Sequence, residues 1–389
     1  MDFAFNQEQE AFRREVQEFI KKEFPSEWRH VKGFFELLCV SKEDWKIHVA
    51  MAKKFGEKGW LSLAWPKEYG GRNSPILQNI FTEELAYNEC PGYDIFGVGM
   101  IAPTLLIYGS EEQKRTFLPP IGRGEIMWCE GLSEPDAGSD LASLKTTAVK
   151  DGDYYVLNGQ KVWTSGAHLA DWGLVLVRTD PNAPVKHRGL SFFFVDMKTP
   201  GITIHTLRNI ANEYEFNEVF FDGVRVPKEN LVGGENKGWY VTMALLNFER
   251  SDMPVPAIAR RNLDYLLDYA RQKKSLDPVI RRRLAEMVVE CEIARLIHFR
   301  SIWMMEKGTV PVWESAMNKA YSLELAQRVD ALGMQLLGDY SGLVEGSKWA
   351  PWNGRWPYLY LRAIGHTLEM GSSEVDRILL SQTGLGLPR

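Results

Sequence analysis

The sequence predicts an α+β protein in which an antiparallel β-domain lies between two helical regions. Apolar residues recur at helical spacing near both ends of the chain, whereas short strand patterns cluster in the middle. Those strands do not alternate with long helices, which argues against a doubly wound parallel sheet. The expected domains are a helical one over 1–125, a β-sandwich or barrel over 126–235 and a helical one over 236–389.

The N-terminal region carries clear helix-start signals. Asn6 can cap a helix together with Gln9, after which Phe12, Val16 and Ile20 fall on one face. Ser110 offers similar capping chemistry further on. Other helices are expected over 43–59, 78–87 and 96–108.

The middle region reads as strands. Asp151-Gly152 separates two β-patterned segments, which is a strong hairpin signal. The expected strands are 146–150, 154–157, 172–178, 190–195, 202–207 and 217–221. No GxGxxG or P-loop motif is present, which argues against a Rossmann or nucleoside-triphosphate site.

The C-terminal region returns to helices. Pro254 and Pro256 predict a kink or break just past Arg250. A helical core stripe is expected from Leu284, Met287, Val288, Cys291 and Ala294. Residues 344–359, with three tryptophans and two prolines, are expected to form a loop or insertion.

Composition excludes several classes of protein. The net charge is −5 and 45% of residues are hydrophobic, so neither nucleic-acid binding nor a membrane surface is indicated. No apolar run reaches membrane length, and no secretory signal is recognised. Four cysteines without CxxC or Cys/His spacing suggest neither a metal site nor a disulfide framework. A cytoplasmic location is expected.

Three stretches could carry chemistry, each with a plainer interpretation beside it. Glu249-Arg250 is either a solvated ion pair or a buried functional acid with its neighbour. The loop 133–140 either binds a phosphate or a heteroaromatic edge, or is an ordinary turn rich in Ser, Gly and Asp. Trp163-Thr164-Ser165 either stacks on a flat cofactor or places a core tryptophan at a strand end.

Six segments in order resemble the acyl-CoA dehydrogenase family over essentially the whole chain. They are 66–71 (PKEYGG), 109–114 (GSEEQK), 133–140 (SEPDAGSD), 158–165 (NGQKVWTS), 224–227 (VRVP) and 385–389 (LGLPR). The resemblance implies an N-terminal α-domain, a middle β-domain and a C-terminal four-helix bundle. It also implies FAD, an acyl-CoA substrate, an electron-transferring flavoprotein as partner, and a role in lipid catabolism by β-oxidation.

The same resemblance assigns contacts to flavin and coenzyme A. Leu132 and Ser133 would meet the flavin edge, Trp163 would cover the isoalloxazine, and Ser165 would lie near N4 and N5. Gly138 counts among the cofactor contacts, and Ser139 would lie toward the pyrophosphate or the pantetheine arm.

The catalytic base occupies one of two positions in this family. A carboxylate removes the pro-R α-proton while the β-hydrogen leaves as hydride to flavin N5. One base position precedes the glycine of a Gly-Thr-x-x-Ile motif, and here that residue is Met370, before Gly371. The other directly precedes an arginine on a bundle helix, which identifies Glu249 as the expected base and Arg250 as its neighbour near the CoA moiety. Met370 is expected to offer its backbone N–H to the thioester carbonyl.

One family motif is missing. An Arg-x-x-Phe-Gly segment that reaches the flavin of a neighbouring subunit is absent from residues 270–278. Gln335 and Gly338 resemble the other inter-subunit flavin contact, and Ser372 and Glu374 fit flavin-facing positions. The assembly is therefore expected to be a homotetramer or an α2β2 heterotetramer.

Alternatives to a stand-alone dehydrogenase stay open. One is a catalytically silent subunit that completes a partner's flavin site, and another is an oxidase of the same fold. The base position favours a bulky, branched or cyclic acyl group.

Overall fold

The computed structural model describes residues 4–24, 42–252 and 254–388, and it divides into two compact units. One unit is helical and combines residues 1–35, 74–90 and 250–389. The other combines 36–73 and 91–249 and contains the β-sheet. The order of helical, β-rich and helical regions confirms the predicted α+β class.

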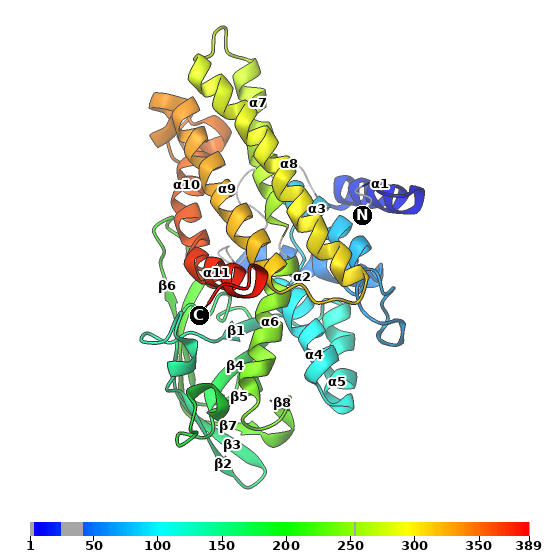
Figure 1. Cartoon of the computed structure of the whole chain (residues 1–389), viewed down its shortest axis with the longest axis vertical. Coiled ribbons are helices and arrows are strands. Elements are labelled where there is room, and N and C mark those ends of the chain that lie inside the picture. Colours follow the sequence, from blue (N-terminus) through cyan, green and yellow to red (C-terminus); the bar gives the residue numbers. More distant parts are fainter. Residues whose placement is uncertain (1–3, 25–41, 253, 389) are drawn as a thin grey trace. The chain divides into compact units, whose positions relative to one another are not determined.

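The helical unit is built around long helices that lie side by side (Figure 1). Its core joins apolar residues of α7, α8, α9 and α10, including the predicted stripe residues Leu284, Met287, Cys291 and Ala294. α3 packs against α1, α7 and α8. The helices are α1 (Gln7–Glu23), α3 (Pro75–Tyr87), α7 (Val255–Arg271), α8 (Pro278–Glu306), α9 (Trp313–Leu337), α10 (Arg355–His366) and α11 (Ser373–Leu379).

Local signals set several helix ends as predicted. Asn6 and Gln9 form a reciprocal capping box at the start of α1, and Ser110 and Gln113 form another at the start of α5. The predicted break past Arg250 is confirmed, because α6 ends at Asp252 and α7 begins at Val255.

The β-containing unit has an eight-stranded sheet among its described residues, in the order β6-β7-β3-β2-β4-β5-β8, with β1 paired to β4. Asp151 pairs with Tyr154 across the predicted hairpin. The strands are β1 (Trp128–Gly131), β2 (Thr147–Asp151), β3 (Tyr154–Lys161), β4 (Trp172–Arg178), β5 (Leu190–Asp196), β6 (Ile202–Leu207), β7 (Phe216–Pro227) and β8 (Leu231–Val232).

Two features of the sheet depart from the expected all-antiparallel pairing. β1 runs parallel to β4, with Trp128 opposite Trp172, and Thr147 of β2 makes a parallel pairing with Arg178. The helices of this unit are α2 (Lys42–Glu57), α4 (Ala102–Tyr108), α5 (Glu111–Gly122) and α6 (Gly238–Asp252); a π-helical turn, Ile95–Ile101, leads into α4.

The expected loop over 344–359 is partly wrong. Residues from Arg355 onward belong to α10, and Trp356 is fully buried in the helical core while Trp349 stays 66% exposed. The indole nitrogen of Trp356 donates to the carbonyl of Asp330, which holds this tryptophan in the core. The tryptophan cluster therefore combines a surface residue with a core residue.

Candidate functional site

A buried lysine organises the loop that follows β1. Lys161 has no exposed surface, and its Nζ donates to the carbonyl of Leu132 and to Glu134 Oε1, both at 2.9 Å. Burial lowers the pKa of Lys161 to about 8 despite the charge of Glu134. Burial opposes ionisation of Glu134, but Lys161 and a hydrogen bond from Thr146 outweigh it and hold the pKa of Glu134 below its usual value. The backbone at Leu132 and Ser133 is fixed by these contacts.

The predicted cofactor residues Trp163 and Ser165 lie next to that loop. The amide of Val162 donates to the carbonyl of Ser133 at 2.9 Å, which joins the two segments. Trp163 has a φ of 61° and is 58% exposed, an unusual placement for so large an aromatic side chain. Its ring meets Phe216 edge to face.

This pair of segments fits a flat heteroaromatic group with polar edges. Thr164 is buried, and its hydroxyl has no hydrogen-bond partner within the described parts of the chain. The hydrogen bond between Val162 and Ser133 therefore brings the segment with the exposed Trp163 next to the ordered backbone of Leu132 and Ser133. The isoalloxazine of FAD has both the flat surface and the heteroatoms that such groups would contact.

Gly138 and Ser139 lie in an exposed turn of the same loop. A Cβ built on Gly138 would meet no atom within 4 Å, so space is open above this backbone. The turn is flanked by exposed ion pairs of Asp136 with Lys145 and of Asp140 with Lys186. A phosphate-bearing ligand would find room here, and the predicted contacts of both residues remain predictions.

The expected base, Glu249, lies in α6 and is only 9% exposed. A second acid, Glu130 of β1, belongs to the same compact unit and is partly buried, with its Oε1 shielded from solvent and without a hydrogen-bond partner among the described residues. Burial, followed by the negative charge of Glu249, raises the pKa of Glu130 well above its usual value. The negative charge of Glu249 therefore disfavours ionisation of Glu130 while Glu249 is itself ionised.

Glu130 was missed in the sequence reasoning. The available signal was an acid inside the apolar strand Trp128–Gly131, where its side chain had to be either paired or functional.

Arg250 and Met370 come together in the helical unit. Arg250 Nε donates to the Met370 carbonyl at 3.3 Å and forms an ion pair with buried Asp376 at 3.3 Å. Lys319 Nζ lies 3.0 Å from Asp376 and also donates to the carbonyl of Gly371. Met370 has a φ of 57°, so the backbone turns sharply at the predicted thioester contact. The two cations hold that turn through their carbonyl contacts.

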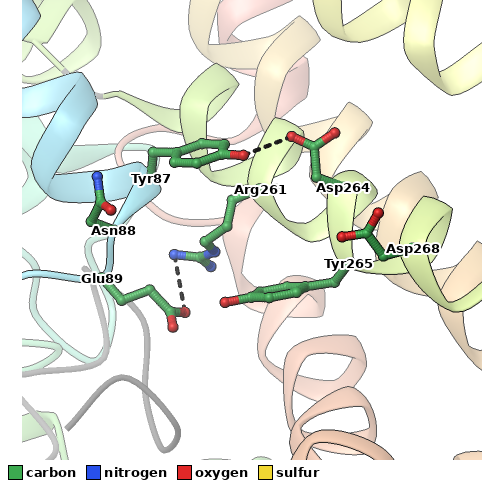
Figure 2. A pocket seen from close by; sticks show the side chains of 7 residues that line it. All are labelled: Tyr87, Asn88, Glu89, Arg261, Asp264, Tyr265 and Asp268. Carbon is green, nitrogen blue, oxygen red and sulfur yellow. Dashed lines mark hydrogen bonds and ion pairs between the residues drawn. The ribbon is translucent and has the colours of Figure 1, made fainter. Parts of the chain in front are cut away.

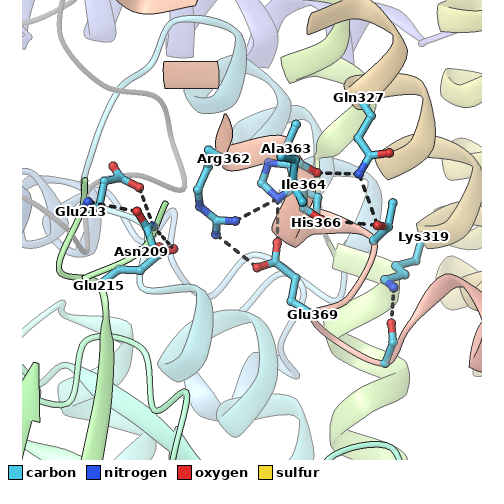
Figure 3. Close-up of polar contacts among 12 residues, drawn as sticks. Asn209, Glu213, Glu215, Lys319, Gln327, Arg362, Ala363, Ile364, His366 and Glu369 are labelled. Carbon is cyan, nitrogen blue, oxygen red and sulfur yellow. Dashed lines mark hydrogen bonds and ion pairs between the residues drawn. The ribbon is translucent and has the colours of Figure 1, made fainter. Parts of the chain in front are cut away.

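Glu369, adjacent to the vacated base position, is held in an ion-pair cluster. Figure 3 shows its carboxylate between Arg362, at 3.2 Å, and His366, at 2.7 Å. Burial opposes its ionisation, but the charges and hydrogen bonds of Arg362 and His366 prevail and lower the pKa of Glu369 to about 2. A carboxylate stabilised to that extent is a weak proton acceptor.

The remaining predicted flavin contacts fall at two places on the helical unit. Ser372 caps α11 by accepting from the Val375 amide, and Glu374 is exposed in its first turn. Gln335, which accepts from Arg283, and Gly338 lie at the end of α9. Lys319, which bonds the backbone beside Ser372, precedes Gln335 by 16 residues of α9, or about 24 Å of helix. Within one chain, the pair Ser372 and Glu374 therefore lies far from the pair Gln335 and Gly338.

Neither a metal centre nor a membrane span is found in the parts of the chain that the structure describes. No group of three or more His, Cys, Asp or Glu side chains there is arranged to hold a metal ion. None of the helices in the described ranges is long and apolar enough to cross a bilayer.

Comparison with known proteins gives matches along almost the entire chain. Residues 6–125, 129–224 and 236–385 match the N-terminal, middle and C-terminal domain models of acyl-CoA dehydrogenases. The chain is 34% identical to "Acyl-CoA dehydrogenase IpdE1" of Mycobacterium tuberculosis, over 98% of this chain and 99% of that protein.

Two solved structures are similar to this chain over its whole length. The "Tcur3481-Tcur3483 steroid ACAD" has a TM-score of 0.90 at 31% identity, with 100% of both chains covered. The ChsE4-ChsE5 complex from Mycobacterium tuberculosis has a TM-score of 0.88 at 33% identity, again with 100% of both chains covered. The chain belongs to the acyl-CoA dehydrogenase family.

Proposed function

We propose that this chain converts an acyl-CoA thioester to its trans-2-enoyl-CoA, with Glu249 removing the α-proton. FAD, when bound, supplies the acceptor for the β-hydride. Leu132, Ser133, Trp163 and Ser165 would hold its ring system, because they group an exposed indole with ordered polar backbone. Electrons would then pass to an electron-transferring flavoprotein.

The observation that supports this proposal is the contrast between the two family base positions. Position 370 is a methionine, and the adjacent Glu369 is stabilised as an anion by Arg362 and His366. Glu249 is buried in the unit that carries Leu132, Ser133 and Trp163, and its negative charge raises the pKa of Glu130 further beyond the effect of burial. A desolvated carboxylate is the stronger proton acceptor of the two.

The thioester would be held by groups on the helical unit. The Met370 N–H would donate to the developing negative charge on the thioester oxygen, and Arg250 and Ser139 would contact the CoA moiety. Arg250 already orders the backbone of Met370 through its carbonyl contact. Gln335, Gly338, Ser372 and Glu374 would contact flavins of the assembly from two separate places.

The acyl group is proposed to be bulky and cyclic or branched, and the assembly to be a tetramer. One similar structure is described as a steroid ACAD and another as a complex of two named components, ChsE4 and ChsE5. The first description supports a large, polycyclic acyl group, and the paired names in both descriptions support a heteromeric assembly, such as an α2β2 tetramer, over a homotetramer. Size-exclusion chromatography with light scattering, with and without a co-expressed paralogue, tests the assembly.

Substitution of Glu249 by glutamine tests the base. The Glu249→Gln variant should retain flavin and thioester binding but lose flavin reduction by about two or more orders of magnitude. Anaerobic rapid mixing with a panel of straight, branched and steroid-derived CoA thioesters measures the rate. Glu369→Gln is the matched control and should remain within a few-fold of the parent. Reduction of Glu249→Gln at a near-parent rate would exclude this residue as the base.

A silent subunit is the second candidate function, because the Arg-x-x-Phe-Gly segment is absent. Arg271, at the corresponding place, ends α7 and forms an exposed ion pair with Asp268. A purified chain without a flavin absorption band, and without bleaching by any acyl-CoA, would favour this candidate. Consumption of dioxygen in the absence of an acceptor protein would instead favour an oxidase.

A further inference from the structure

A cavity of about 180 Å³ lies within the helical unit. Figure 2 shows the residues that line it: Tyr87, Asn88 and Glu89 at the end of α3, and Arg261, Asp264, Tyr265 and Asp268 on α7. The four α7 residues are spaced by three, four and three positions, which places them on one face of that helix. None of these seven residues is among those assigned above to flavin or thioester.

Charges around the cavity are already compensated. Glu89 is 3% exposed, and its Oε1 accepts from Arg355 and lies 3.2 Å from Arg261 Nη1. Asp264 accepts from the hydroxyl of Tyr87 at 2.9 Å. Asp268 accepts from Arg271, so each acid in the wall has a cation or hydroxyl of its own. A neutral hydrogen-bonding ligand fits this arrangement better than a further ion.

One hydrogen-bonding atom of the wall is left open, and a hydroxyl lies on the same side of the cavity. Glu89 Oε2 is shielded from solvent and has no hydrogen-bond partner among the residues that the structure describes. The hydroxyl of Tyr265 is directed to the same side of the cavity in Figure 2. A buried acceptor without a donor is destabilising, so a ligand that supplies one is favoured. An alcohol can donate to Oε2 and accept from the tyrosine hydroxyl.

The cavity residues of α7 lie about 9 to 20 Å along the helix from its start at Val255. This helix starts at Val255, shortly after Arg250, whose side chain bonds the Met370 carbonyl. At 1.5 Å per residue, Arg261 is about 9 Å and Asp268 about 20 Å from the start of the helix. A long or fused-ring acyl group has a comparable length.

We propose that this cavity binds a hydroxyl group on the distal part of the acyl group, through Glu89 Oε2 and the hydroxyl of Tyr265. The inference rests on the proposed function and deepens it, because it assigns the substrate class as hydroxylated, extended acyl-CoA thioesters. Tyr265 and Glu89 are then specificity residues at the end remote from the reacting carbons.

The test uses two fused-ring acyl-CoA thioesters that differ only by one ring hydroxyl. Calorimetric Kd values and flavin-reduction rates are measured for the flavin-loaded protein and for Tyr265→Phe, with Tyr360→Phe, an exposed tyrosine of α10, as the control. The parent and the control should bind the hydroxylated ester about tenfold more tightly than its deoxy analogue. Tyr265→Phe should reduce this preference several-fold. Glu89→Gln should also reduce it; because this change leaves Arg261 and Arg355 without their anion, its folding is checked by circular dichroism first.

Equal binding of the two esters by the parent would overturn the inference, as would a full preference in Tyr265→Phe. Flavin reduction without any hydroxyl preference would leave the proposed dehydrogenase function standing and remove only the cavity assignment. A hydroxyl preference lost in Tyr265→Phe, without flavin reduction by either ester, would support the cavity assignment and count against the stand-alone enzyme.

Discussion

Two acids in this protein, Glu130 and Glu369, are both withdrawn from water but have opposite acidities. Burial, and then the negative charge of Glu249, raise the pKa of Glu130. Glu369 has Arg362 and His366, and its pKa falls to about 2. Burial raises the pKa of both carboxyls; a neighbouring acid adds to that effect at Glu130, whereas two neighbouring basic groups reverse it at Glu369.

This difference has a functional reading within the proposed mechanism. Glu130 and Glu249 together keep a high affinity for a proton, which a general base requires. Glu369, beside Arg362 and His366, has a low affinity for a proton and forms an ordered ion-pair cluster instead. The first suits chemistry on a weakly acidic carbon, and the second suits the support of the backbone around Met370.

Removal of the arginine from the Glu369 cluster should have the largest effect on stability. Arg362→Leu leaves a half-buried carboxylate without its main cation, which typically costs 3–5 kcal/mol. About 3 kcal/mol is expected here, because His366 can still take up a proton. Chemical unfolding at pH 7 measures the loss. Arg377→Leu, which breaks an exposed pair with Glu324, should cost less than about 1 kcal/mol. Similar losses for the two variants would contradict the comparison.

Acid pH should weaken the same cluster. Because the pKa of Glu369 falls from 4.5 in the unfolded chain to about 2 in the folded one, its stabilisation is present above pH 4.5 and is lost as the pH falls toward 2. The free energy of unfolding should therefore drop by up to about 3 kcal/mol more in the parent than in Glu369→Gln across this range. Parallel pH profiles of the two proteins would show that Glu369 does not gain this stabilisation.

Glu130→Gln should give the smallest effect, measured as the change in the free energy of unfolding over one pH unit. Its sign is opposite to that of Glu369, because the parent loses stability as the pH rises. The folded pKa of Glu130 is raised, so the parent loses stability as the pH rises above the unfolded value of 4.5, whereas the variant does not. From pH 5 to pH 6 the stability of the variant relative to the parent should rise by at most about 1.4 kcal/mol. The exposed Glu112→Gln variant serves as the control. A relative stability that stays constant with pH would show that Glu130 is ionised in the folded protein.

Local sequence determined much of the fold. The capping box of Asn6 and Gln9, the hairpin at Asp151-Gly152 and the proline break after α6 were all readable, because each depends on residues within a few positions of one another. The α+β class followed from helical spacing at both ends and strand patterns in the middle, and the family followed from six motifs in order. The predicted site residues Leu132, Ser133 and Trp163 also proved to lie in two joined segments.

Only the tertiary structure decided which distant groups meet. The influence of Glu249 on Glu130 spans more than a hundred residues of sequence, as does the pairing of Glu89 with Arg261 and Arg355. The parallel pairing of β1 with β4 and the burial of Trp356 beside an exposed Trp349 also depend on how elements pack. Periodicity and local propensity specify the face of an element but not its partner. The acidity of a buried carboxyl depends on that partner, so it could not be predicted from the sequence.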